Sequence, residues 1–230
     1  AAGLVDPRVV PARRSELLEL QFTTGRETIV AGVKRVLPGE TVTIAGGRVI
    51  DRRVRPALPE AAPLAIDEDE ALARLDAVLA DSVSVHERAD VPYGLFLSGG
   101  IDSSALLALM ARLDGRPVRA FTAGFDVAGV ADERAHARWL AQRLGAEHVE
   151  VGFSEADFWT YLPRVAAAMD DPAADYATLP TYKLAETAAK GLKVVLCGEG
   201  GDELFAGYGR YRSLLRPFWL GGRPLRAKGT

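Results

Sequence analysis

The sequence predicts an α/β protein whose parallel sheet is covered by helices on both faces, as in doubly wound folds. From about residue 67 onward, short apolar runs alternate with segments in which apolar residues recur every three or four positions. The links between these segments are short, which favours strands joined by crossover helices. Hydrophobic residues make up 48% of the 230 residues and charged residues 26%, enough apolar material for a globular core.

The overall charge and the single cysteine exclude several classes of protein. The formal net charge is -3, so no basic field indicates nucleic acid as a partner. No apolar run reaches the roughly 18 residues that a membrane-spanning helix needs, and no basic-then-apolar leader is visible. One cysteine, Cys197, cannot form an internal disulfide or a multi-cysteine zinc site. We therefore expect a cytoplasmic protein with neither nucleic acid nor a membrane as a partner.

The first part of the chain favours β structure. Residues 41–44 and 48–50 are β-prone runs, and the Gly-Gly pair between them is typical of a hairpin turn. A segment of this size is too short to bury a stable core alone, so we expect it to depend on another part of the protein. The proline-rich stretch 56–63 that follows indicates a linker.

Helix and strand signals then alternate along the chain. Asp67 with Glu70 is a capping-box-like start, and apolar residues at helical spacing continue this helix to about Val85. Pro163 is expected to kink or restart a later helix. We expect helices at about 67–85, 106–113, 135–144, 158–169 and 179–190, and strands at 93–97, 118–125, 147–151 and 193–197.

The strongest local signal is the run Ser-Gly-Gly-Ile-Asp-Ser-Ser at residues 98–104, between an expected strand and an expected helix. Its glycines let the backbone approach a ligand closely, and the N–H groups and dipole at a helix start favour an anion. Asp102 inside an anion site would be explained by a Mg2+ ion that bridges phosphates. A plain strand-to-helix turn with a serine cap is the alternative, and the missing lysine excludes a Walker A loop.

A second glycine-rich loop, residues 198–208, follows the last expected strand. It carries Glu199, Asp202 and Glu203, which would repel one another without a cation or a cationic substrate. In an open parallel sheet the carboxyl ends of the strands are where ligands bind. A solvated acidic loop that caps the next helix is the alternative.

A histidine and a glutamate share another of the expected strands. His148 lies two residues before Glu150. The pair could form a metal site, or both side chains could serve the strand end or lie near bound phosphates.

The whole pattern from Asp67 to about Tyr211 resembles the synthetase domain of the glutamine-dependent asparagine synthetase family. The first loop on its own resembles the pyrophosphate-binding loop of the N-type ATP pyrophosphatases, and residues 22–25 and 32–39 are similar to the end of the family's N-terminal glutaminase domain. The features occur in the family's order: the loop 98–104, the strand 121–125 with Asp126 and Asp132, His148 with Glu150, and the segments 171–175, 179–182 and 198–208.

The resemblance implies a fold and a division into domains. The fold would be a doubly wound parallel sheet of the PP-loop ATP pyrophosphatase (adenine nucleotide α-hydrolase-like) type, preceded by a small β remnant of a glutaminase domain. Residues 1–58 would be that remnant, 59–66 a linker and 67–230 the ATP-binding synthetase domain. The family's nucleophilic N-terminal cysteine and its long C-terminal helical region are absent. We therefore expect a piece of a longer protein, which leaves open whether the 230 residues are active alone.

The resemblance also implies a role for each matching residue. Glu199 and Asp202 would be catalytic, and Asp102 and Asp202 would serve Mg2+. Tyr208 would lie near the substrate pocket, and Cys197 would be a packing residue and not a nucleophile. ATP would be bound by Leu97, Ser98, Gly99, Gly100, Asp102, Ser103, Ser104, Ala123, Cys197 and Gly198, with the first loop around the pyrophosphate.

The implied reaction is that of a glutamine-hydrolysing asparagine synthase. The side-chain carboxylate of aspartate attacks the α-phosphate of ATP, which gives an acyl adenylate and pyrophosphate, and ammonia from glutamine then displaces AMP. The expected partners are thus small molecules, with a homodimer left open for the full-length protein. β-Lactam synthetases and lasso-peptide cyclases carry similar loops and remain alternatives, as does a noncatalytic nucleotide-binding fragment.

Overall fold

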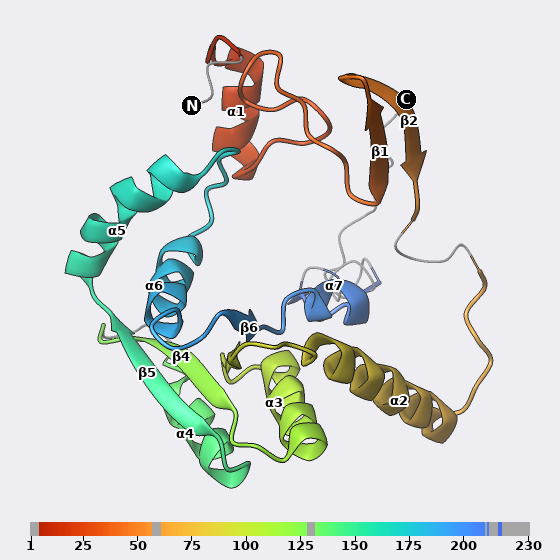
Figure 1. The fold of residues 1–230 in the computed structure, drawn as a ribbon, viewed down its shortest axis with the longest axis vertical. Helices are drawn as coiled ribbons and strands as arrows, with labels where there is room; N and C mark the ends of the chain where they lie inside the picture. The colour runs from red at the N-terminus through yellow and green to blue at the C-terminus, as the bar shows by residue number, and fades with distance from the viewer. Residues whose placement is uncertain (1–4, 57–60, 128–131, 210, 212–215, 218–230) are drawn as a thin grey trace. The chain divides into compact units, whose positions relative to one another are not determined.

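The computed structural model describes residues 5–56, 61–127, 132–209, 211 and 216–217 (Figure 1). Part of the expected linker and the end of the expected synthetase domain lie outside these described residues. The elements, in chain order, are α1 (Pro11–Leu20), β1 (Glu40–Ala45), β2 (Arg48–Val54), α2 (Glu68–His86), β3 (Tyr93–Phe96), α3 (Ile101–Asp114), β4 (Arg119–Phe125), α4 (Arg134–Arg143), β5 (Glu147–Phe153), α5 (Glu155–Ala168), α6 (Thr178–Ala188), β6 (Val194–Leu196) and α7 (Gly201–Phe205).

The chain forms two compact units. Ala1–Glu68 and Glu155–Tyr182 make the first unit, and Asp69–Ser154 and Lys183–Thr230 make the second. The domain boundaries expected from the sequence, at residues 58 and 67, stay predictions.

The first unit contains the expected hairpin. β1 and β2 pair antiparallel, with Ala45 opposite Arg48. Gly46 and Gly47 between them have φ values of 55° and 72°, a left-handed conformation that favours glycine. The unit also contains α1, which the sequence did not predict, because its residues show no strong apolar stripe and none of them is buried.

Two polar connections join distant segments of the first unit. Arg35 donates to the carbonyl and hydroxyl oxygens of Thr23, at 2.5 Å each, and forms an ion pair with Asp171. The Ala174 N–H donates to the Gln21 carbonyl at 2.7 Å. Residues that follow α5 are therefore fastened to the N-terminal segment.

A proline lies inside α5 without interrupting it. The helix continues from Glu155 to Ala168 through Pro163, so the expected restart there is wrong. The ring removes one backbone donor, yet Tyr161 and Val165 on either side are buried, and this packing holds the turn together.

The second unit is built on a parallel sheet with the strand order β5-β4-β3-β6. Leu95 in β3 lies opposite Ala120 in β4 on one side and Leu196 in β6 on the other, so β3 is central. This confirms the parallel α/β architecture.

Apolar clusters cover both faces of this sheet. On one face Leu95 and Leu97 pack with Leu107 and Met110 of α3 and with residues of α2 and α4. On the other face Phe121 and Val151 pack with Leu184 and Ala188 of α6. Because successive residues of a strand point to opposite faces, Leu95 and Phe96 belong to different clusters. Helices on both faces confirm the doubly wound arrangement.

The strand order reverses beside β3. The chain proceeds from β3 to β4 and β5 in one direction and then returns to β6 on the opposite side of β3. The loops that follow β3 and β6 therefore leave the same edge of the sheet from adjacent strands, at the topological switch point where open α/β sheets bind ligands. Both glycine-rich loops of the sequence are these two loops.

Candidate active site

The first loop joins β3 to α3 in a conformation that leaves the helix start uncapped. Gly99 has a φ of 80°, which a residue with a side chain rarely adopts. The N-cap residue of α3 is Gly100, and no side chain caps the helix there. The serine cap of the alternative interpretation is therefore wrong, whereas a plain strand-to-helix turn without a bound anion stays an alternative. The first-turn N–H groups and the helix dipole are available to an anion.

The serines of this loop serve its own backbone. The hydroxyl oxygens of Ser98 and Ser103 lie 3.0 Å apart, and Ser98 Oγ accepts a hydrogen bond from the Gly100 N–H at 3.2 Å. Ser104 donates to the Gly100 carbonyl at 2.6 Å. Ser103 is only 4% exposed. The hydroxyl groups thus stabilise the conformation of the loop's own backbone.

The second loop begins after β6 and contains the short helix α7. Gly200, at its N-cap, has a φ of 92°, and Asp202 and Glu203 occupy the first turn. No side chain caps this helix, so the acidic loop does not cap it as the alternative interpretation expected. Carboxylates in a first turn are nevertheless favoured by the helix dipole. Glu199 precedes this turn and is exposed, and Asp202 is half-buried.

Glycines bring the second loop into contact with the first. A Cβ atom added at Gly198 would lie 2.9 Å from the backbone nitrogen of Ser103 and 3.0 Å from Cβ of Asp102. A Cβ atom added at Gly201 would lie 2.5 Å from Cγ of Asp102. Only residues without a side chain allow this approach, so the two loops form one surface at the switch point.

Three of the expected site residues lie outside the contact between the two loops, and each has its own surroundings. Tyr208 donates to Glu203 at 2.8 Å, and its ring packs edge-on against Tyr211. Cys197 is exposed and not packed, which corrects the expectation from sequence. The reason is its position one residue beyond β6, where the packed part of the strand has ended. Ala123 lies in β4, half-buried against the cluster around Phe121.

Sequence reasoning missed the polar residue behind the first loop. Thr122 is buried in β4, 1% exposed, and its hydroxyl donates to the Leu97 carbonyl at 2.6 Å. The same hydroxyl contacts Nε2 of His148 at 2.8 Å. The only signal in the sequence was a hydroxyl-bearing residue within an otherwise apolar strand.

Asp102 and Asp202 are the two acidic residues of the described loops expected to hold Mg2+. Asp102 lies against Gly201, the residue next to Asp202, so the two carboxylates belong to touching segments. Within the residues that the structure describes, no group of three or more histidine, cysteine or acidic side chains is arranged to hold a metal. Mg2+ in nucleotide sites takes only one or two carboxylates and fills its shell with phosphate oxygens and water, so this donor set suffices.

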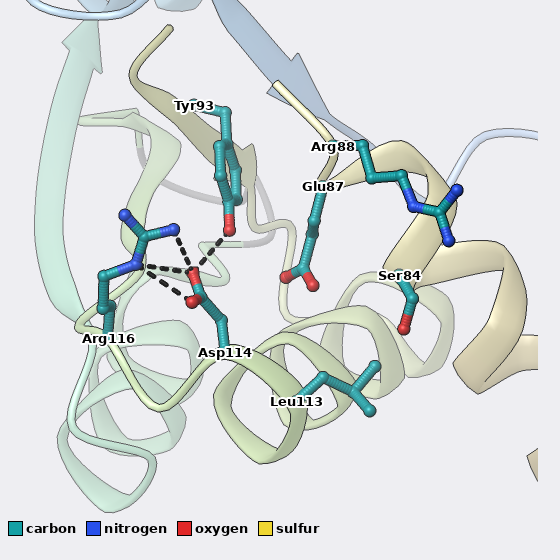
Figure 2. A pocket seen from close by; sticks show the side chains of 7 residues that line it. All are labelled: Ser84, Glu87, Arg88, Tyr93, Leu113, Asp114 and Arg116. Atoms are coloured by element: carbon teal, nitrogen blue, oxygen red, sulfur yellow. Dashed lines mark hydrogen bonds and ion pairs between the residues drawn. The ribbon is translucent and has the colours of Figure 1, made fainter. Parts of the chain in front are cut away.

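Two hollows of the described surface lie elsewhere, at the opposite edge of the sheet. One holds about 210 Å³ and is lined by residues around the amino end of β3 and the end of α3 (Figure 2). In it Tyr93 donates to Asp114 at 2.6 Å, and Arg116 binds the same carboxylate at 2.9 Å. A second hollow of about 480 Å³ adjoins it and includes Glu147. Neither is lined by the glycine-rich loops.

Uncapped amides at the switch point of an open parallel sheet are typical of α/β proteins that bind nucleotides. The comparison with family models is more specific, because the model described as asparagine synthase matches residues 74–228. The chain belongs to the asparagine synthase family. This confirms the family resemblance inferred from the sequence.

Individual relatives agree with the family match. A Mycobacterium tuberculosis relative is 41% identical over 212 residues, which cover 90% of this chain and 32% of that protein. The Bacillus subtilis protein named asparagine synthetase (glutamine-hydrolyzing) 1 is 36% identical over 206 residues, 88% of this chain and 32% of its own length. The chain thus spans about a third of the length of these curated relatives.

One solved structure shows a limited likeness to this chain. It is the NH3-dependent NAD synthetase from Campylobacter jejuni, with a TM-score of 0.40 and 20% identity. The match covers 63% of this chain and 62% of that one. Among the described residues, no helix has both the length and the apolar character to cross a membrane.

Proposed function

We propose that this chain is the ATP-binding part of an amide-forming ligase of the asparagine synthetase type. It would activate the side-chain carboxylate of aspartate with ATP, release pyrophosphate, and let ammonia form asparagine and AMP. The observation that carries the proposal is the packing of Gly198 and Gly201 against Asp102, which joins the two glycine-rich loops at the switch point. Membership of the asparagine synthase family supports the same reading.

ATP would lie along the carboxyl ends of the central strands. The backbone at Leu97, Ala123, Cys197 and Gly198 would contact the adenosine half, and the loop 98–104 would hold the pyrophosphate. The uncapped start of α3 supports this assignment, because its N–H groups and dipole are complementary to phosphate charge. Asp102 and Asp202 would hold Mg2+, which when bound neutralises the charge that develops on the departing pyrophosphate.

The reaction would proceed in two balanced steps. In the first, a carboxylate oxygen of aspartate bonds to the α-phosphorus while the bond to the bridging oxygen of the β-phosphate breaks, and pyrophosphate leaves. In the second, the nitrogen of ammonia bonds to the acyl carbon, AMP leaves with its oxygen, and the nitrogen loses a proton. Glu199 is exposed near this surface, so its carboxylate can take that proton as a general base.

Several parts of the proposal concern a longer protein. Residues 1–58 would be the end of a glutaminase domain, 59–66 a linker and 67–230 the synthetase domain. Glutamine would be the source of ammonia through the rest of that glutaminase domain. A cytoplasmic location and a homodimer stay predictions of the family resemblance.

Pyrophosphate exchange tests the proposed chemistry. The chain is incubated with Mg-ATP, aspartate and labelled pyrophosphate, and label in ATP is measured. We expect exchange that depends on aspartate and persists in Glu199→Gln, which instead loses formation of asparagine from added ammonia. Exchange without aspartate, or with another carboxylate in its place, would overturn the assignment of substrate. No exchange by a folded chain that binds Mg-ATP would show that this piece does not adenylate.

A further inference from the structure

The peptide unit between Leu97 and Ser98 is held on both sides. Its carbonyl oxygen, on Leu97, accepts a hydrogen bond from the Thr122 hydroxyl at 2.6 Å. Its N–H, on Ser98, donates to Ser103 Oγ at 3.2 Å. This unit is the first of the loop 98–104, so its orientation sets the direction in which the loop leaves β3.

The Thr122 hydroxyl has one hydrogen, and that hydrogen is used by Leu97. The contact between Thr122 Oγ1 and His148 Nε2, at 2.8 Å, must therefore have the histidine as donor and the hydroxyl oxygen as acceptor. Nε2 of His148 therefore carries a proton. The chain of donors then runs from His148 through Thr122 to the Leu97 carbonyl.

The other ring nitrogen of His148 lies near a carboxylate. Its Nδ1 lies 3.6 Å from Glu150, whose carboxylate receives two hydrogen bonds from Arg138 of α4, at 2.6 and 2.8 Å. Burial lowers the pKa of His148, partly opposed by Glu150. The hydrogen bonds from Arg138 lower the pKa of Glu150. The lowered pKa favours the neutral ring, and the contact with Thr122 assigns the single proton of that ring to Nε2.

We propose that Thr122 and His148 are positioning residues that set the peptide unit between Leu97 and Ser98 and thereby the affinity of the first loop for the phosphates of ATP. The inference rests on the proposed ATP site. The Thr122 hydroxyl reaches the loop through the Leu97 carbonyl, and His148 reaches it through Thr122. If the pair served stability alone, its loss would lower the melting temperature and leave the affinity of the remaining folded protein unchanged.

Two substitutions at one position separate these roles. Thr122→Val removes the hydroxyl at nearly constant size, and Thr122→Ser retains it. We expect the valine variant to bind Mg-ATP about tenfold more weakly by calorimetry, and the serine variant to stay close to the parent. Thr187→Val is the matched control, because the Thr187 hydroxyl also donates to a backbone carbonyl, at 2.9 Å, but in α6. Parental affinity in folded Thr122→Val would overturn the proposal.

Magnetic resonance tests the arrangement without any nucleotide. The sequence contains three histidines, so loss of a ring signal in His148→Gln identifies His148. We expect the Nε2-protonated tautomer in the parent, and faster hydrogen exchange of the Ser98 amide in Thr122→Val than in Thr122→Ser. An Nδ1-protonated ring, or equal exchange in the two variants, would overturn the inference. If the parent itself bound no Mg-ATP, the proposed function would fail, while these two readouts would still decide the positioning role.

Discussion

The carboxylate of Asp102 occupies the space into which a side chain at Gly201 would extend. A Cβ atom there would lie 2.5 Å from Cγ of Asp102 and 2.7 Å from each carboxylate oxygen. The two residues are 99 positions apart in sequence, since 201 − 102 = 99, and belong to loops that follow different strands. Their contact converts two separate glycine-rich loops into one candidate nucleotide site.

We predict that Gly201→Ala weakens binding of Mg-ATP with little loss of stability. The added methyl group meets the end of a short side chain, so the Asp102 carboxylate can rotate away while the backbone stays in place. We expect the affinity to fall about tenfold, measured by calorimetry, because one favoured Mg2+ ligand is displaced. Gly209→Ala is the control, since an added Cβ there meets nothing within 4 Å. Equal affinities for the two variants would argue against the site.

We predict that Gly198→Ala lowers the stability of the fold. Here the added Cβ would lie 2.9 Å from a backbone nitrogen, that of Ser103, which cannot move without shifting the start of α3. Overpacking of this kind costs about 1–3 kcal/mol. Urea denaturation of the variant and of Gly209→Ala measures the difference, and an unchanged midpoint would show that the loops are not packed as described.

Glu40 should stabilise the first unit at neutral pH and lose this effect in acid. Hydrogen bonds from Arg26 and from the Leu37 N–H lower the pKa of Glu40 from 4.5 to about 2. The contribution is therefore present above pH 4.5 and disappears as the pH falls toward 2. We expect Glu40→Gln to lower the melting temperature at pH 7 and to have little effect near pH 2. A similar loss with Glu19→Gln, an exposed site on α1, would contradict this explanation.

Glu87, unlike Glu40, should lower the stability of the fold at neutral pH. Burial and the nearby Asp114 raise the pKa of Glu87 (Figure 2). Its Oε1 atom is buried, with no hydrogen-bond partner among the described residues. The charged form is therefore less favourable in the folded state, and the cost begins as the pH rises through 4.5, the ordinary value. We expect Glu87→Gln to raise the melting temperature at pH 7 and to have no effect at about pH 3. A lower melting temperature of Glu87→Gln than of the parent at pH 7 would contradict the prediction that the Glu87 charge destabilises the fold.

The sequence predicted those features that depend on local pattern. Apolar runs and helical spacing located the four strands of the parallel sheet and helices α2, α3, α4 and α6, but not the short helix α7. The glycines at 99, 100, 198 and 201 marked both loops. Features that depend on the register between strands could not be predicted this way. The bond from Thr122 to Leu97 joins residues in different strands, and it follows from the parallel pairing of β3 with β4. Helix α1 was not predicted because none of its residues is buried, so its sequence carries no apolar stripe at helical spacing.

Direct binding of Mg-ATP tests the central claim most closely. Calorimetric titrations compare the parent chain, Asp102→Ala, and Asp76→Ala, which removes an exposed carboxylate paired with Arg112. The account predicts binding by the parent and by Asp76→Ala, and a loss of about tenfold or more in Asp102→Ala without a change in fold. Unchanged affinity in Asp102→Ala, or no binding of Mg-ATP by the folded parent, would contradict a nucleotide site at the two glycine-rich loops.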